Sequence, residues 1–327
     1  MQYARQEIDQ RNWINGLSNE EFLKRVSSIR INEEQKKTYF NQSPNLRQLR
    51  ASLCNQKGHA GAVEDFGNVV EPTVLYPRNF PTGLELEHPS TFDEREIVDH
   101  IDLLSKPGGW VFDPFLGSGA TLTACFKTGR KGAGIELMPR WVELAKKKIE
   151  VATGSPYAKG RHNLHIAEGD CLAVMDTIQP GFFDFIITSP PYFNIMKPGT
   201  GIRARNRRRE GLATDFGNHQ RELGSIENYG AFTKEINRIY SGLYRVLKPG
   251  RFMVLVVADI SPKGKFVPFH VDTILSGLAA GFDLVGIQVV FDYWKKNQDY
   301  GIPRKFFLNF HHHYALVFQK KDSQALH

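Results

Sequence analysis

The chain has 327 residues, of which 41% are hydrophobic and 24% charged, and its formal net charge is +7. This composition is typical of globular proteins and excludes wholesale disorder, a collagenous repeat and a small disulfide-built domain. The three cysteines are scattered without a C-x-x-C pair, so we expect a reducing compartment and neither a disulfide framework nor a thiolate zinc site. The sequence shows no apolar run near the roughly 20 residues of a membrane-spanning helix and no secretory signal, so we expect a cytoplasmic protein without a membrane partner.

Residues 1–85 differ in pattern from the rest of the chain. One helix is expected from Ser18, which stands three residues before Glu21 in the spacing of a capping box. Residues 39–81 contain scattered proline, glycine and asparagine and show little periodicity. We therefore interpret 1–85 as a small appended region, mainly helical or irregular.

From about residue 109 to residue 318, short β-rich apolar runs alternate with helical patterns. Strands are expected at 110–113, 132–136, 163–167, 183–189, 251–259, 282–291 and 313–319. Helices are expected between them, at 120–129, 139–152, 229–247 and 270–281. This alternation predicts an α/β fold with a seven-stranded, mostly parallel sheet covered on both faces. The last two strands have no helix between them and are expected to pair as an antiparallel hairpin at the sheet edge.

A glycine-containing turn follows the first of these strands. The strand ends at Asp113, and a helix is expected from about Ala120. Gly117 and Gly119 permit positive φ and close approach of a ligand to the backbone, beside the free N–H groups of a helix N-terminus. The turn is not a Walker loop, because no Lys-Ser/Thr follows it. As a dinucleotide fingerprint it is incomplete, because Leu122 holds the position of the last glycine.

Three successive strands end in carboxylates, Asp113, Glu136 and Asp170. The carboxyl ends of strands in an open α/β sheet are where ligands bind, and an acid in this position commonly holds a ribose. Each acid taken alone could simply cap a helix. Together they favour an adenosine-type ligand.

The fourth strand ends in Ser189, Pro190, Pro191 and Tyr192. The two prolines have fixed φ and no N–H, so the strand cannot continue. They present the Pro190 carbonyl beside a serine hydroxyl and an aromatic ring. For an arbitrary Pro-Pro-Tyr the ordinary interpretation is a rigid loop exit, but this loop lies at the same sheet edge as the three carboxylates.

A basic cluster follows this loop. Between Lys197 and Gly211, six basic residues accompany one acid. Such a cluster is equally consistent with a polyanion-binding segment and with a solvated loop.

Two motifs, DPFLGSGAT (113–121) and TSPPY (188–192), resemble those of the amino-methylating DNA methyltransferases. These enzymes use S-adenosylmethionine and act on N4 of cytosine or N6 of adenine. The resemblance covers roughly residues 88–320, and its further elements are HPSTF (88–92), YRVLKPGRFMVLV (244–256), YWKKN (293–297) and HHHYALVFQK (311–320). It implies a Rossmann-like class I methyltransferase domain at 86–320, with a basic insertion at 193–228 and a tail at 321–327.

The resemblance also implies roles for individual residues. The Ser189 hydroxyl and the Pro190 carbonyl would accept hydrogen bonds from the target amine, and Tyr192 would stack on a base flipped out of double-stranded DNA. The catalytic set is Ser189, Pro190, Pro191 and Tyr192. The cofactor-binding set is Asp113, Pro114, Phe115, Gly117, Ser118, Gly119, Glu136, Asp170, Cys171 and Ser90. The expected DNA-binding residues are Arg203, Arg205, Arg207, Arg208 and Arg209.

No metal is expected, because the sulfonium is already a good electrophile. We interpret His311–His313 as structural, since consecutive strand residues face opposite sides of a sheet. A C5-cytosine mechanism is disfavoured, because none of the cysteines follows a proline. Only nine residues follow Phe318, so DNA recognition is expected from 1–85, from the insertion or from both.

Serine before Pro-Pro is more typical of cytosine-N4 enzymes, so the resemblance favours a site-specific DNA (cytosine-N4)-methyltransferase of a bacterial or phage restriction-modification system. A cognate restriction endonuclease is a candidate partner, and the expected location is the cytoplasm near the nucleoid. The alternatives are an adenine-N6 methyltransferase, a nicotinamide-dependent oxidoreductase, a non-catalytic nucleic-acid-binding relative and an RNA substrate.

Overall fold

The computed structural model describes residues 74–75, 87–88, 93–193, 209, 211–213, 217, 219, 221–262, 265–291 and 311–322. The chain divides into two compact units, residues 1–70 and 71–327, and every described residue lies in the second. The helix expected from Ser18 therefore lies outside the described residues, and the domain boundary expected near residue 85 stays a prediction. No helix in the described part of the chain is long and apolar enough to span a membrane.

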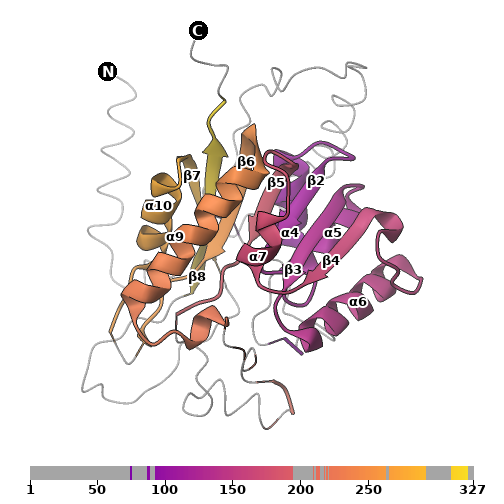
Figure 1. Cartoon of the computed structure of the whole chain (residues 1–327), viewed down its shortest axis with the longest axis horizontal. Coiled ribbons are helices and arrows are strands. Elements are labelled where there is room, and N and C mark those ends of the chain that lie inside the picture. The colour runs from indigo at the N-terminus through magenta and orange to yellow at the C-terminus, as the bar shows by residue number, and fades with distance from the viewer. Residues whose placement is uncertain are drawn as a thin grey trace, which may run out of the picture. The chain divides into compact units, whose positions relative to one another are not determined.

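The second unit is built on an eight-stranded sheet in the order β1-β7-β8-β6-β5-β2-β3-β4 (Figure 1). The strands are β1 (Val74–Leu75), β2 (Trp110–Asp113), β3 (Lys131–Glu136), β4 (Leu164–Glu168), β5 (Phe183–Thr188), β6 (Leu247–Val257), β7 (Phe282–Phe291) and β8 (His312–Lys320). All seven predicted strands are present. The two-residue β1 is an addition that the sequence did not predict, and it pairs in parallel with β7.

The sheet is parallel except at β8, which lies antiparallel between β6 and β7. The predicted antiparallel pairing of the last two strands is thus confirmed. Strand order reverses between β2 and β5, because the chain proceeds from β2 to β3 and β4 on one side and from β5 to β6 on the other. This reversal is the topological switch point of a Rossmann-like fold, where ligands bind beyond the carboxyl ends of the strands.

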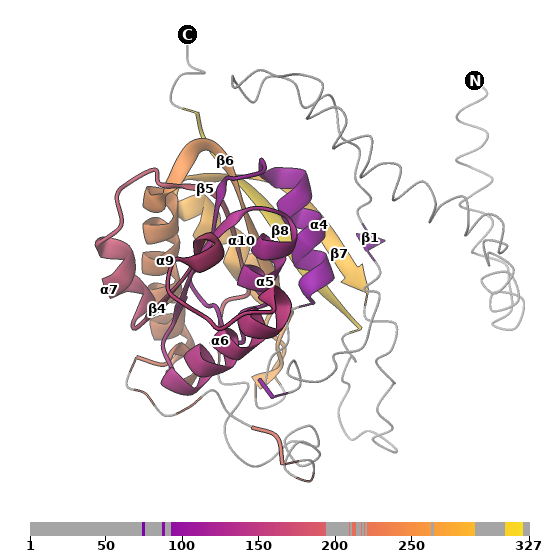
Figure 2. The same ribbon diagram turned by 90° about the vertical axis from the view of Figure 1, so that its right-hand side faces the viewer.

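Helices cover both faces of the sheet, as Figure 2 shows. The α-helices are α4 (Glu94–Leu104), α5 (Ala120–Lys127), α6 (Pro139–Thr153), α7 (Cys171–Asp176), α9 (Tyr229–Val246) and α10 (Phe269–Ala279). One buried apolar cluster includes residues of α4, α5 and α6, and the other includes residues of α7, α9 and α10. The predicted α/β class with a covered parallel sheet is confirmed.

Helix α9 shows how local sequence sets these elements. The Asn228 side chain caps it by accepting a hydrogen bond from the Ala231 N–H. Apolar residues recur at helical spacing and are buried against the sheet. They are Phe232, Ile236, Ile239, Tyr240, Leu243 and Val246.

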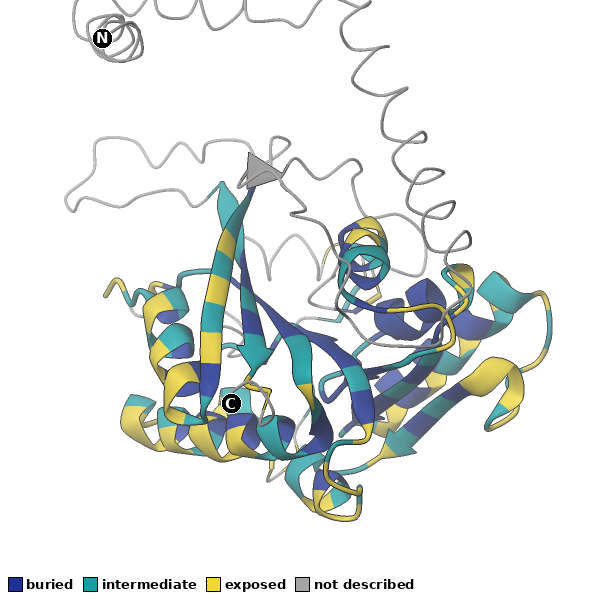
Figure 3. Cartoon of the chain, turned by 90° about the horizontal axis from the view of Figure 1, so that it is seen from above, coloured by how far each residue is buried: buried dark blue, intermediate teal, exposed yellow. Residues whose placement is uncertain are grey.

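Strand β7 contributes to both buried clusters, because Phe282 packs in the one that includes α10 and Val290 in the one that includes α4. Asp283, Val285 and Ile287 are exposed in alternation with more buried residues, which appears in Figure 3 as alternating colours along this strand.

Helix α10 packs against β7, and Gln288 further along the strand contacts His100 of α4 at 2.8 Å. The register with β8 shifts between Leu284 and Gly286, so the two halves of β7 present their buried residues to different faces of the sheet.

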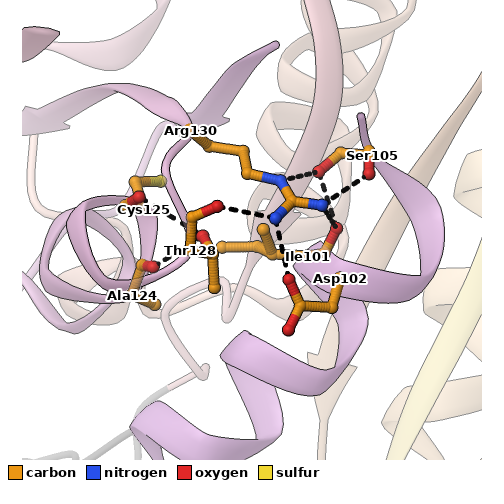
Figure 4. A network of polar contacts seen from close by, with 7 residues as sticks. All are labelled: Ile101, Asp102, Ser105, Ala124, Cys125, Thr128 and Arg130. Atoms are coloured by element: carbon orange, nitrogen blue, oxygen red, sulfur yellow. Dashed lines mark hydrogen bonds and ion pairs between the residues drawn. The ribbon is translucent and has the colours of Figure 1, made fainter. Parts of the chain in front are cut away.

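A buried arginine joins α4 to the turn between α5 and β3 (Figure 4). The Arg130 guanidinium donates to Asp102 Oδ1 at 2.8 Å, to the Thr128 carbonyl at 2.7 Å, and to both the Oγ and the carbonyl of Ser105 at 3.2 and 2.8 Å. Its side chain is only 7% exposed. This single side chain therefore satisfies acceptors at the end of α4 and in the turn before β3.

We expect Arg130→Met to lower the free energy of unfolding by about 3 kcal/mol, because it keeps the buried volume but leaves the acceptors without their donor. Urea denaturation measures the change. Arg238→Met is the matched control, because that arginine is 56% exposed and, in the described part of the chain, forms its ion pair with Glu235 of the same helix. This control should cost less than about 0.5 kcal/mol. Equal losses in the two variants would contradict the assigned role of Arg130.

Candidate active site

The candidate site lies at the switch point, where the loops after β2, β3 and β5 meet. The Thr188 hydroxyl at the end of β5 donates to Asp113 Oδ1 at 2.6 Å. This bond ties the strand that leads into Ser-Pro-Pro-Tyr to the strand that leads into the glycine loop. The two motifs identified in the sequence are therefore neighbours in space.

Asp113 forms hydrogen bonds that join the glycine loop to the start of α5 and the end of β5. It is 2% exposed and accepts hydrogen bonds from the Thr121 hydroxyl at 2.6 Å and the Phe115 N–H at 3.0 Å, in addition to Thr188. Burial raises the pKa of this carboxyl, and the three hydrogen bonds oppose that effect. Its oxygens are thus directed to the protein itself, and Asp113 is absent from the lining of the cavity described below.

Gly119 also lies behind the cavity rather than in its lining. It caps α5 with φ +87°, and a Cβ placed on it would lie 2.9 Å from the Ala145 Cβ. Gly117, by contrast, lines the cavity with φ +53° and lies close to His88, where an added Cβ would be 3.2 Å from the ring. Glycine at 119 therefore serves the packing of α5 on α6, and glycine at 117 serves the cavity wall.

Glu136 is held by two backbone amides. Its Oε2 accepts from the Gly117 N–H and its Oε1 from the Met138 N–H, each at 2.9 Å. Burial raises the pKa of this carboxyl, the two amides lower it, and the charge of Asp113 adds a smaller increase. Glu136 thereby links the loop after β2 to the loop after β3, and it lines the cavity.

Asp170 caps α7, and it also reaches the cavity. Its Oδ1 accepts from the Leu172 and Ala173 N–H groups at 3.0 and 3.1 Å, and its Oδ2 lies 3.8 Å from Nε of Arg221. The neighbouring Cys171 lines the same cavity, and burial raises the pKa of its thiol to about 12. The thiol is therefore uncharged near neutral pH and is poorly suited to act as a nucleophile.

The Ser-Pro-Pro-Tyr loop forms another wall of the cavity, and all four of its residues line it. The Tyr192 hydroxyl accepts a hydrogen bond from the Ala258 N–H at 3.0 Å. The centroid of the Tyr192 ring lies 5.7 Å from the centroid of the Phe269 ring. The next residue, Phe193, is buried in the apolar core. The loop is thus anchored at its end, directly after the residues that face the cavity.

These walls enclose a cavity of about 220 Å³. The predicted site residues in its lining are Pro114, Phe115, Gly117, Ser118, Glu136, Asp170, Cys171, Ser189, Pro190, Pro191 and Tyr192. The structure therefore brings most of the predicted catalytic and cofactor residues into one cavity. Their assigned roles stay predictions.

Other lining residues were not predicted to be functional. Trp141 on α6 is 5% exposed, and its ring centroid lies 4.6 Å from that of His88. The sequence of its helix has an ordinary amphipathic pattern, so nothing in the sequence distinguishes Trp141 from a core residue. Further lining residues come from the segment before α9 and from α9 itself, and they are Arg221, Glu222, Leu223, Ile226, Glu235 and Ile239.

Part of the predicted site falls outside the described residues. This applies to Ser90, Arg203, Arg205, Arg207, Arg208 and the YWKKN element at 293–297. Arg209 is described and is exposed. In β8, His312 contacts the Tyr314 hydroxyl while His313 contacts Glu96 Oε2, so these two adjacent histidines have different partners.

Comparisons with known proteins agree with the motifs. A family model described as DNA methylase, of the N6/N4 type, matches residues 8–147 and 183–326. The orphan methyltransferase M.BamHII of Bacillus amyloliquefaciens is 34% identical over 67 residues, which are 20% of this chain and 25% of that protein. The type II methyltransferase M.Cfr9I of Citrobacter freundii is 38% identical over 63 residues, or 19% of this chain and 21% of that protein.

The matched part of the chain thus spans a quarter or less of the length of these relatives. Among solved structures, a TehB-like SAM-dependent methyltransferase from Corynebacterium glutamicum is 16% identical, with a TM-score of 0.36 over 70% of this chain and 87% of that chain. The family model alone covers more than half of the chain, and it confirms the resemblance found in the motifs. The chain belongs to the N6/N4 DNA methylase family.

Proposed function

We propose that this protein transfers the methyl group of S-adenosylmethionine to N4 of cytosine in DNA. The observation that carries the proposal is the single cavity lined by both Glu136 and the Ser189–Tyr192 loop. One wall offers carboxylates suited to an adenosine-type ligand, and another offers acceptors suited to an exocyclic amine. Methyl transfer requires the methyl donor and the exocyclic amine to lie side by side, because much of the catalysis is positioning.

The residues present fit S-adenosylmethionine. The Glu136 carboxylate accepts from the Gly117 and Met138 amides on different oxygens, and a carboxylate has further acceptor capacity for a ribose hydroxyl. Asp170 Oδ2 has no backbone donor among the contacts above and is suited to accept from the adenine amino group. The loop from Pro114 to Ser118 would hold the methionine part. The bound cofactor would supply a methyl group on a positively charged sulfur.

The Ser189–Tyr192 loop fits the target base. The amine lone pair of cytosine is delocalised into the ring, and acceptors on its N–H groups favour the nucleophilic form. The Ser189 hydroxyl and the Pro190 carbonyl are suited to accept those bonds, and the Tyr192 ring is suited to stack on the base. The base would leave the duplex at a cost of a few kcal/mol, offset by these contacts.

The serine before Pro-Pro supports cytosine over adenine, and adenine-N6 methylation is the second candidate because both reactions use the same cavity. We also place the protein in the cytoplasm, in a restriction-modification or phage modification system. The direct test is sequencing, with detection of modified bases, of DNA from cells that express the chain. We expect N4-methylcytosine within one short recognition sequence; N6-methyladenine would support the second candidate, and unmodified DNA would contradict both.

S-adenosylmethionine at 100 times its Kd should stabilise the folded chain by about 2.7 kcal/mol. For a chain of this size we expect Tm to rise by about 5 °C. Differential scanning fluorimetry measures the shift, with NAD at the same concentration as the comparison. A shift with NAD alone would support the oxidoreductase alternative instead, because that class also accounts for Gly117 and Glu136.

A further inference from the structure

Tyr192 is held at two points by residues from distant segments. Its hydroxyl accepts from the N–H of Ala258, the first residue after β6. Its ring lies 5.7 Å from that of Phe269, the first residue of α10. The orientation of this ring therefore depends on the end of β6 and the start of α10 keeping their relative positions.

The residues that follow these two contacts bind each other. Asp259 follows Ala258, and His270 follows Phe269. Asp259 Oδ1 accepts from the His270 backbone N–H at 3.2 Å and lies 2.6 Å from His270 Nδ1. The Asp259 side chain is 5% exposed and that of His270 is 22% exposed. The pair thus fastens the end of β6 to the first turn of α10, one residue away from each contact with Tyr192.

Strand β8 supports the pair from a third side. The Tyr314 ring stacks on the His270 ring, with centroids 4.2 Å apart and planes at 22°. Its hydroxyl lies 3.5 Å from Asp259 Oδ2 and 2.9 Å from His312 Nε2. The imidazole is therefore fixed in its plane as well as at its Nδ1 atom. The cavity lining includes none of the four residues of this cluster, which are Asp259, His270, His312 and Tyr314. The cluster therefore does not touch the space where the reaction would take place.

We propose that Asp259 and His270 are positioning residues that hold Tyr192 in the orientation needed to stack on the flipped base. The proposal rests on the proposed function, because stacking matters only if a base enters the cavity. A displacement of about 1 Å at a reacting centre is enough to lower a rate by about 100-fold. Loss of the His270 side chain loosens the ring without removing it, so the effect should be smaller, and we expect it to be about ten-fold in kcat.

The test uses the full chain and two duplexes that carry the recognition sequence found by sequencing. The unmodified duplex serves to measure kcat, and a duplex with 2-aminopurine in place of the target nucleotide serves to measure base flipping. His270→Ala removes the side-chain partner of Asp259 and keeps the backbone N–H, whereas His270→Asn retains an amide N–H near the position of Nδ1. We expect His270→Ala to lower kcat about ten-fold with the Kd of S-adenosylmethionine within two-fold of wild type. Fluorescence of the flipped 2-aminopurine should rise, because a less ordered Tyr192 quenches it less. His270→Asn should restore most of the wild-type kcat and return the fluorescence close to its wild-type value.

Tyr192→Phe supplies an independent arm, because it keeps the ring and removes the oxygen that accepts from Ala258. Its effect and that of His270→Ala should combine less than additively in the double variant, since both loosen the same ring. His162→Ala, at an exposed histidine in the turn before β4, is the control for histidine loss and should behave as wild type.

Wild-type kcat and fluorescence in His270→Ala would overturn the proposal, as would fully additive effects with Tyr192→Phe. If His270→Ala fails to fold, Tyr192→Phe carries the test, because it removes the contact with Ala258; wild-type kcat and fluorescence in that variant would overturn the proposal. Failure of the wild-type chain to methylate or flip any base is a different result, because it would overturn the proposed function and this inference with it.

Discussion

Ser189→Ala is expected to lower kcat for DNA methylation by about 100-fold, the usual cost of removing one preorganised hydrogen-bonding group from a reacting centre. The change removes one of two acceptors proposed for the target amine and leaves the Pro190 carbonyl in place. The Kd of S-adenosylmethionine should stay within two-fold of wild type, because the cofactor residues lie on other loops. Transfer of a radioactive methyl group into DNA measures kcat, and isothermal titration calorimetry measures Kd.

Ser241→Ala is the matched control, since that serine lies exposed on α9 and contacts only the Asn237 carbonyl of its own helix among the hydrogen bonds described. It should retain the wild-type rate. A Ser189→Ala variant with a wild-type kcat would exclude the serine as an acceptor. If Ser189→Ala instead weakens binding of S-adenosylmethionine, Ser189 acts on the cofactor and not on the target amine, which would contradict the proposed role.

Glu136→Gln should weaken binding of S-adenosylmethionine by 10- to 100-fold, since a hydrogen bond to a charged group contributes about 1.5 to 3 kcal/mol. Glutamine has one oxygen and one NH₂ group, so it cannot accept from both the Gly117 and Met138 amides. One amide would then face another donor, and the loop after β2 or the loop after β3 would shift. Calorimetric titration at pH 7.5 measures the loss.

The pH dependence provides a second readout for Glu136. Burial raises the pKa of this carboxyl, and the ionised form is the one that accepts two amides. The affinity of the wild-type chain should therefore fall as pH decreases toward that raised pKa, whereas Glu136→Gln should lack this component. Glu143→Gln is the control, because Glu143 is 64% exposed on α6 and pairs with Lys146. Equal affinities for all three chains at every pH would contradict the role given to Glu136.

The sequence predicted the sheet well because its strands are apolar, β-rich and bounded by turn residues. It did not predict α7, whose six residues from Cys171 to Asp176 are too few to display a helical period. It also missed α4, in which charged residues alternate with the buried Ile97 and Ile101 over only three turns. Strand β1 is defined by its pairing with β7, a contact between segments more than 200 residues apart that no local pattern reveals.

A place in the cavity lining was predictable for residues at the carboxyl ends of strands, as for Glu136, Asp170 and Ser189. It was less predictable where position in space decides the role. Asp113 lies in the expected motif, yet its oxygens bind Thr121 and Thr188 beneath the cavity. Glu222 lines the cavity, although its segment has no periodicity and no motif. Burial raises the pKa of that carboxyl, a property that only the folded surroundings create.

Joint occupation of one cavity by a sulfonium donor and a flipped cytosine is the central claim. The most direct measurement is incubation of the purified chain with methyl-tritiated S-adenosylmethionine and DNA bearing its recognition sequence, followed by digestion to nucleosides and chromatography. We predict that the label elutes as N4-methyldeoxycytidine and that Ser189→Ala lowers its rate of appearance. Label in N6-methyldeoxyadenosine would contradict the choice of base, and unlabelled DNA despite measurable cofactor binding would contradict methyl transfer itself.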